Sequence, residues 1–160
     1  MTEEKLNGYF KKAFKEAASA LTKKQGGPFG ALVVKKGKII SSAHNTVLKE
    51  KDPTCHAEVN ALRRASRILK NPHLKGCVLI ATSEPCPMCL AAAYWANVDK
   101  IYYCLPKEVA SKYGFNDGFI YKDLALPAKK RKLGAVRSGG LEKEGMEIFK
   151  KWKNKKGKIY

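Results

Sequence analysis

Glu84-Pro85-Cys86-Pro87-Met88-Cys89 connects two segments with different hydrophobic patterns, and it decides how the chain turns from one to the other. The preceding segment, 77–82, is a continuous apolar run of strand length, typical of a central strand covered on both faces. The second proline suits the first turn of a helix, where its missing N–H has no partner anyway, so we expect a helix over 87–96. The sequence therefore predicts a strand-to-helix junction with the two cysteines one turn apart at the helix start.

Around this junction, the hydrophobic pattern predicts the order helix, two strands, helix, strand, helix, strand. Gly30 in the first strand permits a close approach of another backbone, and Lys36-Gly37-Lys38 joins the first two strands as a hairpin. This order predicts an α/β fold, a mixed sheet with helices on both faces, in one domain over 1–160. The expected helices are 2–24, 55–70 with Thr54 as its N-cap, 87–96, 108–113 and 142–153; the expected strands are 29–34, 39–44, 77–82 and 98–104, with irregular chain over 114–121.

The chain is strongly basic: its 160 residues include 32 lysines and arginines against 14 acidic residues, a net charge of +18. Such a charge suits a polyanionic partner such as RNA, but the lysines are spread over the whole chain, as on a solvated surface. Five cysteines, an odd number, and a start without the features of a signal peptide predict a reducing, cytoplasmic setting. No apolar run approaches the ~20 residues that cross a bilayer, so we expect no membrane span.

Cys55-His56-Ala57-Glu58 supplies the groups that a pair of thiolates needs to form a catalytic zinc site. The positive end of the later helix lowers the pKa of Cys86 and Cys89 toward the thiolate that zinc requires. His56 can add a third ligand from a different helix start, which leaves the fourth tetrahedral position for water or hydroxide. Water in that position ionises near neutral pH, and Glu58 can carry its proton.

A catalytic zinc site at these residues requires a particular position of His56, and other kinds of site also fit part of the pattern. In an ideal helix His56 and Glu58 point about 200° apart, so His56 must stand at or before the first full turn, with the two helices meeting end-on. The C-x-x-C alone also fits a redox pair, a structural zinc site, or two ordinary buried cysteines. A basic nucleic-acid-binding module with a structural zinc predicts a fourth protein ligand, for which His44 and Cys55 are the candidates.

The combined pattern H-x-E…P-C-x-x-C resembles the signature of zinc deaminases that act on nucleobases. Nearly the whole chain also resembles the guanine deaminases of the cytidine-deaminase-like fold. Part of it, including Asn60-Ala61-Leu62-Arg63-Arg64, is similar to tRNA adenosine deaminases as well, but the pieces near the C-terminus favour the guanine deaminases. The matching pieces are 26–31, 52–59, 84–90, 94–96, 114–122 and the terminal Tyr160.

The resemblance implies a three-layer α/β/α sandwich around a central mixed five-stranded sheet. It also implies a homodimer in which the segment 141–160 is swapped onto the partner subunit and covers its site. One zinc ion per subunit is implied on His56, Cys86 and Cys89, with water or hydroxide as the fourth ligand and Glu58 as the proton shuttle.

Further residues are implied to contact the substrate. Asn45 stands where a strand ends and is most often a turn residue at such a place, whereas the resemblance assigns it to the purine edge. Asp117 is implied near the substrate's amino group. The remaining residues implied at or near the site are Ala57, Glu84, Trp95 and Tyr160.

The implied reaction is hydrolysis of free guanine to xanthine and ammonia, a step of purine catabolism. The alternative from the same superfamily is adenosine-to-inosine deamination of tRNA. Three departures from the guanine deaminase pattern, at Asn116, Ala91 and Ser83, leave open another aminopurine or an aminotriazine as the substrate.

Overall fold

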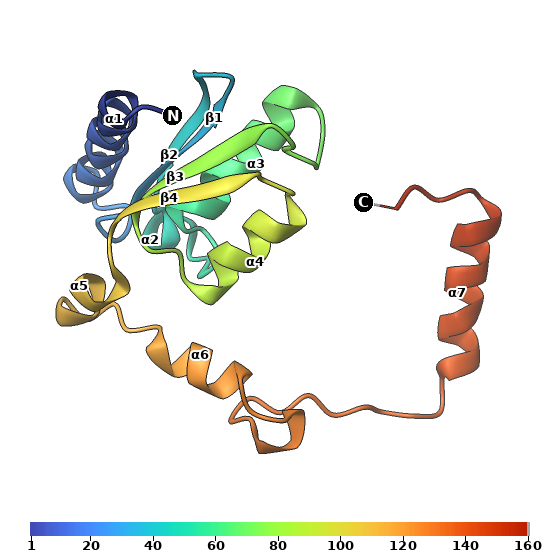
Figure 1. The fold of residues 1–160 in the computed structure, drawn as a ribbon. Helices are drawn as coiled ribbons and strands as arrows, with labels where there is room; N and C mark the ends of the chain where they lie inside the picture. The colour runs from blue at the N-terminus through green and yellow to red at the C-terminus, as the bar shows by residue number, and fades with distance from the viewer. Residues whose placement is uncertain (160) are drawn as a thin grey trace. The chain divides into compact units, whose positions relative to one another are not determined.

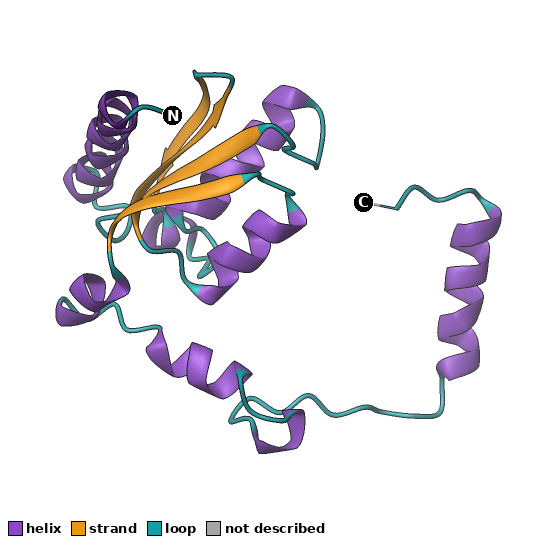
Figure 2. Ribbon diagram, viewed as in Figure 1, coloured by secondary structure: helices purple, strands orange, loops and turns teal. Residues whose placement is uncertain are grey.

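A computed structural model describes residues 1–159 and divides the chain into two units, Met1–Gly118 and the part from Phe119 onward. Figure 1 shows the chain coloured from its N-terminus, and Figure 2 separates helices from strands. The predicted role of Tyr160 falls outside the described residues.

The first unit is built on a four-stranded sheet in the order β2-β1-β3-β4 (Figure 1). Antiparallel pairs join β1 (Gly30–Lys35) to β2 (Lys38–His44) and to β3 (Cys77–Ser83), whereas β3 and β4 (Lys100–Leu105) are parallel. The predicted mixed sheet is therefore confirmed. The prediction of a fifth strand was wrong. Among residues 1–159 the chain continues after β4 with helices, because the strand pattern ends at Pro106.

Helices cover both faces of this sheet, as predicted. On one face, α1 (Glu3–Thr22) contributes Ala13 to a buried cluster with Leu32 and Ile80. On the other face, α3 (Ala57–Leu69) and α4 (Pro87–Trp95) join a larger cluster through buried side chains such as Leu62 and Ala93. Each large aliphatic side chain buried in this way contributes roughly 1.5–3 kcal/mol to stability. Packing against the sheet therefore holds the first residues of α3 and α4 in place.

The remaining helices are short or lie late in the chain. They are α2 (Val47–Glu50), α5 (Lys107–Lys112), α6 (Gly118–Leu124), the 3-10 turn η1 (Ala128–Lys130) and α7 (Glu142–Asn154). The sequence pattern missed α2, which is a single turn, and it assigned irregular chain to 118–121, where α6 begins. The predicted final helix is confirmed as α7. Within residues 1–159, no helix combines the length and the apolar character that crossing a membrane requires.

Candidate active site

Two helices of the first unit begin with a residue of the predicted zinc site. His56 is the N-cap of α3, with extended backbone at φ −67° and ψ 155°, and Cys86 is the N-cap of α4, at φ −65° and ψ 167°. Because His56 precedes the helix, the regular step of about 100° per residue does not separate its side chain from that of Glu58. The expectation that His56 stands at or before the first full turn is confirmed.

Thr54 does not cap α3, contrary to the prediction. Its backbone N–H and its Oγ1 both donate to Asp52 Oδ1 at 2.7 Å, and Cys55 Sγ donates to Asp52 Oδ2 at 3.3 Å. Asp52 thereby closes a turn ahead of the helix, so the helix starts two residues later than expected. Sequence alone does not distinguish these arrangements, because Asp and Thr are both good capping residues.

The donor atoms of His56, Cys86 and Cys89 form a compact group. His56 Nδ1 lies 3.6 Å from Cys86 Sγ and 3.5 Å from Cys89 Sγ, and the three donor atoms lie within 4.8 Å of one another. A tetrahedral ion bonded to sulfur at about 2.3 Å and to nitrogen at about 2.1 Å keeps these atoms about 3.6 Å apart. One imidazole and two thiols at this spacing fit a zinc ion.

The proposed fourth protein ligand of a structural zinc site does not join this group. Among residues 1–159 the cluster of possible ligands contains His56, Cys86 and Cys89. His44 instead bonds to Glu16 and Gln25, and Cys55 bonds to Asp52. A site with three protein ligands is the arrangement that distinguishes a catalytic zinc from a closed structural one.

Burial and mutual hydrogen bonds shift the pKa values of the three candidate ligands and of Glu58 beside them. Hydrogen bonds with Cys89 and His56 outweigh burial and lower the pKa of Cys86 to about 4, while the bond to Cys86 raises the pKa of His56. The pKa of Cys89 is raised by its hydrogen bond with Cys86 and by burial. Burial raises the pKa of Glu58 to about 7. Glu58 is thus a buried carboxyl suited to accept and release a proton near neutral pH.

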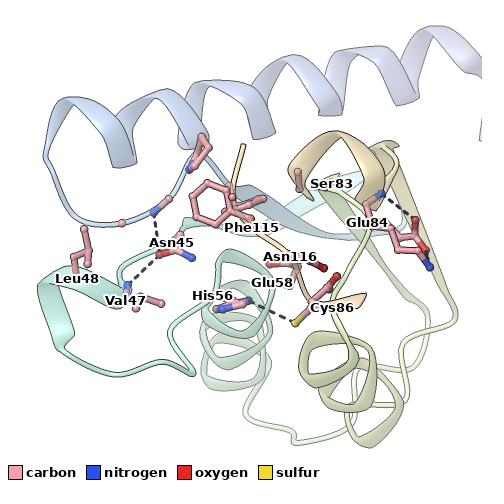
Figure 3. Close-up of a pocket in the computed structure, with 18 of the residues that line it drawn as sticks. Asn45, Val47, Leu48, His56, Glu58, Ser83, Glu84, Cys86, Phe115 and Asn116 are labelled. Atoms are coloured by element: carbon pink, nitrogen blue, oxygen red, sulfur yellow. Dashed lines mark hydrogen bonds and ion pairs between the residues drawn. The ribbon is translucent and has the colours of Figure 1, made fainter. Parts of the chain in front are cut away.

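A cavity of about 700 Å³ opens beside this cluster within the first unit, and His56, Glu58 and Cys86 line it (Figure 3). Glu84 and Asp117 also line the cavity. Burial and the negative charge of Cys86 raise the pKa of Asp117, although Lys107 opposes them. Glu84 Oε2 accepts a hydrogen bond from the backbone N–H of Lys107 at 3.2 Å. The apolar part of the lining includes Leu21, Phe29, Val47, Leu48 and Phe115.

Asn45 forms part of the opposite wall and is 5% exposed (Figure 3). Its Oδ1 accepts hydrogen bonds from the backbone N–H groups of Gly27 at 3.3 Å and Val47 at 3.1 Å. The second of these closes a turn, so Asn45 has the local role that is common for Asn at a strand end. It also lines the cavity. The turn role and a place at the substrate are therefore compatible.

The other predicted contact residues lie in different surroundings. Ala57 is the first residue of α3 and is fully buried, whereas Trp95 ends α4 and is 70% exposed; neither belongs to the cavity lining. Their roles stay predictions. Sequence reasoning did not assign Phe29 and Phe115 to the site, yet their rings meet edge to face at 4.9 Å. Both stand in the stretches that resemble guanine deaminases, which is the signal that marks them.

Comparison with known proteins agrees with this geometry. The family described as "Cytidine and deoxycytidylate deaminase zinc-binding region" matches residues 3–105. The chain belongs to this deaminase family. The matched region contains all three candidate zinc ligands and Glu58 but ends before Asp117.

Relatives of this deaminase differ in how much of the chain they match. The guanine deaminase of Bacillus subtilis is 39% identical over 91% of this chain and 92% of its own length. Its crystal structure superimposes with a TM-score of 0.86 at 38% identity, over 96% of this chain and 95% of that one. The tRNA-specific adenosine deaminase of Aquifex aeolicus is 44% identical, but over 59% of this chain and 62% of its own length. Both relatives therefore share the deaminase core, whereas the guanine deaminase also matches the C-terminal part.

Proposed function

We propose that this deaminase hydrolyses free guanine to xanthine and ammonia, as a step in purine catabolism. The observation that carries the proposal is the extent of the match to the Bacillus subtilis guanine deaminase, which covers 91% of the chain at 39% identity. The match extends well beyond residue 105, where the general family region ends. The reaction consumes one water and balances as guanine plus water giving xanthine plus ammonia.

His56, Cys86 and Cys89 would hold one zinc ion per subunit, with a water molecule as the fourth ligand. When bound, zinc acts as a Lewis acid that makes water nucleophilic near neutral pH. Glu58 lies beside this group, at the second position of α3, with its carboxyl buried. It takes the proton released by the attacking water and returns protons to a ring nitrogen and to the departing amino group.

Asn45 and Asp117 would recognise the base from the cavity wall. Asn45 presents an amide to the cavity, and Asp117 presents a carboxylate that can accept a hydrogen bond from an amino or ring N–H group. A site built from such groups rejects bases that lack the matching partner, because its own buried polar groups are then left unpaired. Phe29 and Phe115 supply apolar surface for the flat faces of the ring.

Incubating zinc-loaded protein with guanine and following xanthine and ammonia tests the proposal. We expect turnover, and absence of guanine turnover would contradict it. The variant Glu58→Gln is expected to keep its zinc and lose at least about a hundredfold in kcat, since a positioned proton carrier contributes roughly 10²–10⁴-fold. Unchanged activity in this variant would show that Glu58 does not carry the proton.

A second candidate is adenosine-to-inosine deamination of tRNA, favoured by the net charge of +18 and by the 44% identity to the Aquifex aeolicus relative. A tRNA editor must admit a flipped nucleotide that remains attached to its strand. Inosine formation in an anticodon stem-loop, measured beside guanine turnover, distinguishes the two substrates. We expect guanine to be the better one.

The functional molecule that we propose is a homodimer in which segment 141–160 covers the partner's site. The support lies in α7, whose apolar side chains Met146, Phe149 and Trp152 are 54%, 76% and 44% exposed. Such a face marks a contact surface, and we assign the partner subunit to it. We also place the enzyme in the cytoplasm, since all five cysteines are unpaired thiols, as in a reducing compartment.

A further inference from the structure

The side-chain amide of Asn45 has one orientation. Its Oδ1 faces two backbone donors, the N–H groups of Gly27 and Val47, at 3.3 and 3.1 Å. If the amide flipped, its NH2 group would face these two N–H groups, and donors would meet donors. Asn45 therefore keeps its oxygen on the backbone and directs its nitrogen to the cavity (Figure 3). Toward a bound base it acts as a hydrogen-bond donor.

Gln25 ties together the two loops that hold this amide. Its backbone carbonyl accepts hydrogen bonds from the N–H groups of Leu48 and Lys49, each at 3.1 Å, and so fixes the turn that follows Asn45. Its side-chain Oε1 lies 2.7 Å from Nε2 of His44, the residue directly before Asn45. Gln25 thus holds the chain on both sides of Asn45.

His44 connects this arrangement to the first helix. The residue is 7% exposed, and its Nδ1 lies 2.9 Å from Glu16 Oε2. Glu16 Oε1 in turn accepts a hydrogen bond from Ser42 Oγ at 2.7 Å. Both ring nitrogens of His44 therefore face oxygen acceptors from α1 and the loop after it. The hydrogen bonds of this buried ring go to Glu16 and Gln25, and the proposed reaction does not use it.

The loops also approach each other too closely for a side chain at position 26. A Cβ on Gly26 would overlap Asn45 Oδ1 and lie 2.7 Å from the Asn45 carbonyl oxygen. Asn45 can therefore keep this place only while position 26 carries no side chain. The two backbone hydrogen bonds to Oδ1 hold the amide there.

We propose that Gln25 and His44 are positioning residues that hold Asn45 as a donor toward the base and thereby set the substrate preference. The inference rests on the proposed function, in which Asn45 contacts the purine edge. Guanine offers two acceptors on one edge, O6 and N7, whereas a 6-aminopurine offers a donor at position 6. An Asn45 that only donates favours guanine over 2,6-diaminopurine, although both carry the 2-amino group that is removed.

The test compares kcat/KM for guanine and for 2,6-diaminopurine. Gln25→Leu keeps the side-chain size and the backbone carbonyl but loses the bond to His44, so the segment that carries Asn45 is held less firmly and its amide donates to the base in a less fixed position. We expect the preference for guanine to fall about tenfold, the effect of one hydrogen bond. Gln25→Glu retains an oxygen that accepts a hydrogen bond when His44 Nε2 carries a proton, and it should keep the preference. If Gln25 had a purely structural role, its substitution would lower kcat/KM equally for both substrates and leave their ratio unchanged.

A double-mutant cycle locates the effect at Asn45. In an Asn45→Ala background, Gln25→Leu should not change the ratio further, because the group that it positions is absent. A further fall of the kcat/KM ratio in the double variant would overturn the proposal. Equal kcat/KM ratios in Gln25→Leu and Gln25→Glu would overturn it as well. Gln25→Ala serves as a second variant if Gln25→Leu does not fold.

Measurements of binding without turnover test this inference separately from the proposed reaction. On a Glu58→Gln background, the Kd values of both bases are measured without turnover. A Kd ratio that shifts in Gln25→Leu and stays in Gln25→Glu supports the positioning role even if wild-type protein does not deaminate guanine. Failure of turnover alone contradicts the proposed function, whereas failure to bind either base, or an unshifted Kd ratio, overturns the inference.

Discussion

Gly30 shows at a single position how the sequence determines the packing of α1 on the sheet. A Cβ there would overlap the carbonyl oxygen of Ala13 and lie 2.8 Å from the backbone nitrogen of Ala17. The close approach predicted for this glycine is therefore confirmed. The helix backbone lies directly against β1 because position 30 carries no side chain.

Gly30→Ala should therefore lower the free energy of unfolding by about 1–3 kcal/mol, since a methyl group forced into a packed contact displaces backbone. Gly8→Ala is the matched control on α1 itself, where an added Cβ meets no atom within 4 Å apart from its chain neighbours and the nearby helix backbone. It should stabilise by roughly 0.5–1 kcal/mol through helix propensity. Urea denaturation measures both, and equal effects would contradict the packing argument.

Glu16 makes a contribution to the free energy of unfolding that depends on pH and that a single substitution can measure. Burial alone raises the pKa of Glu16, but hydrogen bonds from His44 and Ser42 outweigh it and leave the pKa below its ordinary value of 4.5. A carboxyl with a lowered folded pKa stabilises the fold above its unfolded pKa, and this contribution is lost as the pH falls through the folded pKa. Glu16→Gln should thus cost most near neutral pH, and its difference from wild type should shrink below about pH 4.5. Unfolding free energies measured across that range check this, and a constant difference would refute it.

At the scale of elements, the candidate zinc site depends on the starts of two helices. A zinc ion bound there should connect α3 to α4. Cys86→Ser should abolish stoichiometric zinc binding and make the thermal midpoint insensitive to chelators. In wild type, chelation should lower stability by about 2.7 kcal/mol if free zinc is a hundred times Kd. Cys104→Ser, at an exposed cysteine of β4, is the control and should keep its zinc. Metal analysis with and without chelator provides the readout.

The sequence predicted these helix starts with different success. Pro87 located the start of α4 to the residue, because proline is restricted to the first turn. The start of α3 was placed too early, because Asp52 and Thr54 each cap well and only the three-dimensional turn shows that they bond to each other. The missing fifth strand has a similar cause: the resemblance implied it, while the hydrophobic pattern contained four strands.

At the scale of the whole molecule, the functional cluster was more predictable than its supporting residues. His56, Cys86 and Cys89 follow from ligand chemistry and spacing, and the structure brings their donor atoms together. The bonds of Gln25 and His44 join segments 19 residues apart through side chains that carry no motif. Such contacts depend on how α1 packs against β2, which no local pattern encodes.

The exposed apolar face of α7 leads to a prediction about assembly. Met146, Phe149 and Trp152 recur every three residues and so lie on one side of the helix. If a second copy covers this side, the protein sediments at twice the 17.8 kDa mass of one chain. Phe149→Lys should shift it to the monomer and lower guanine turnover, because a buried charge without a partner is costly. Lys151→Gln, about 200° around the helix from Phe149, is the matched control and should remain dimeric. A wild-type monomer at micromolar concentration that turns over guanine would show that the apolar face serves another purpose, since the site would then be complete without the partner's C-terminal segment.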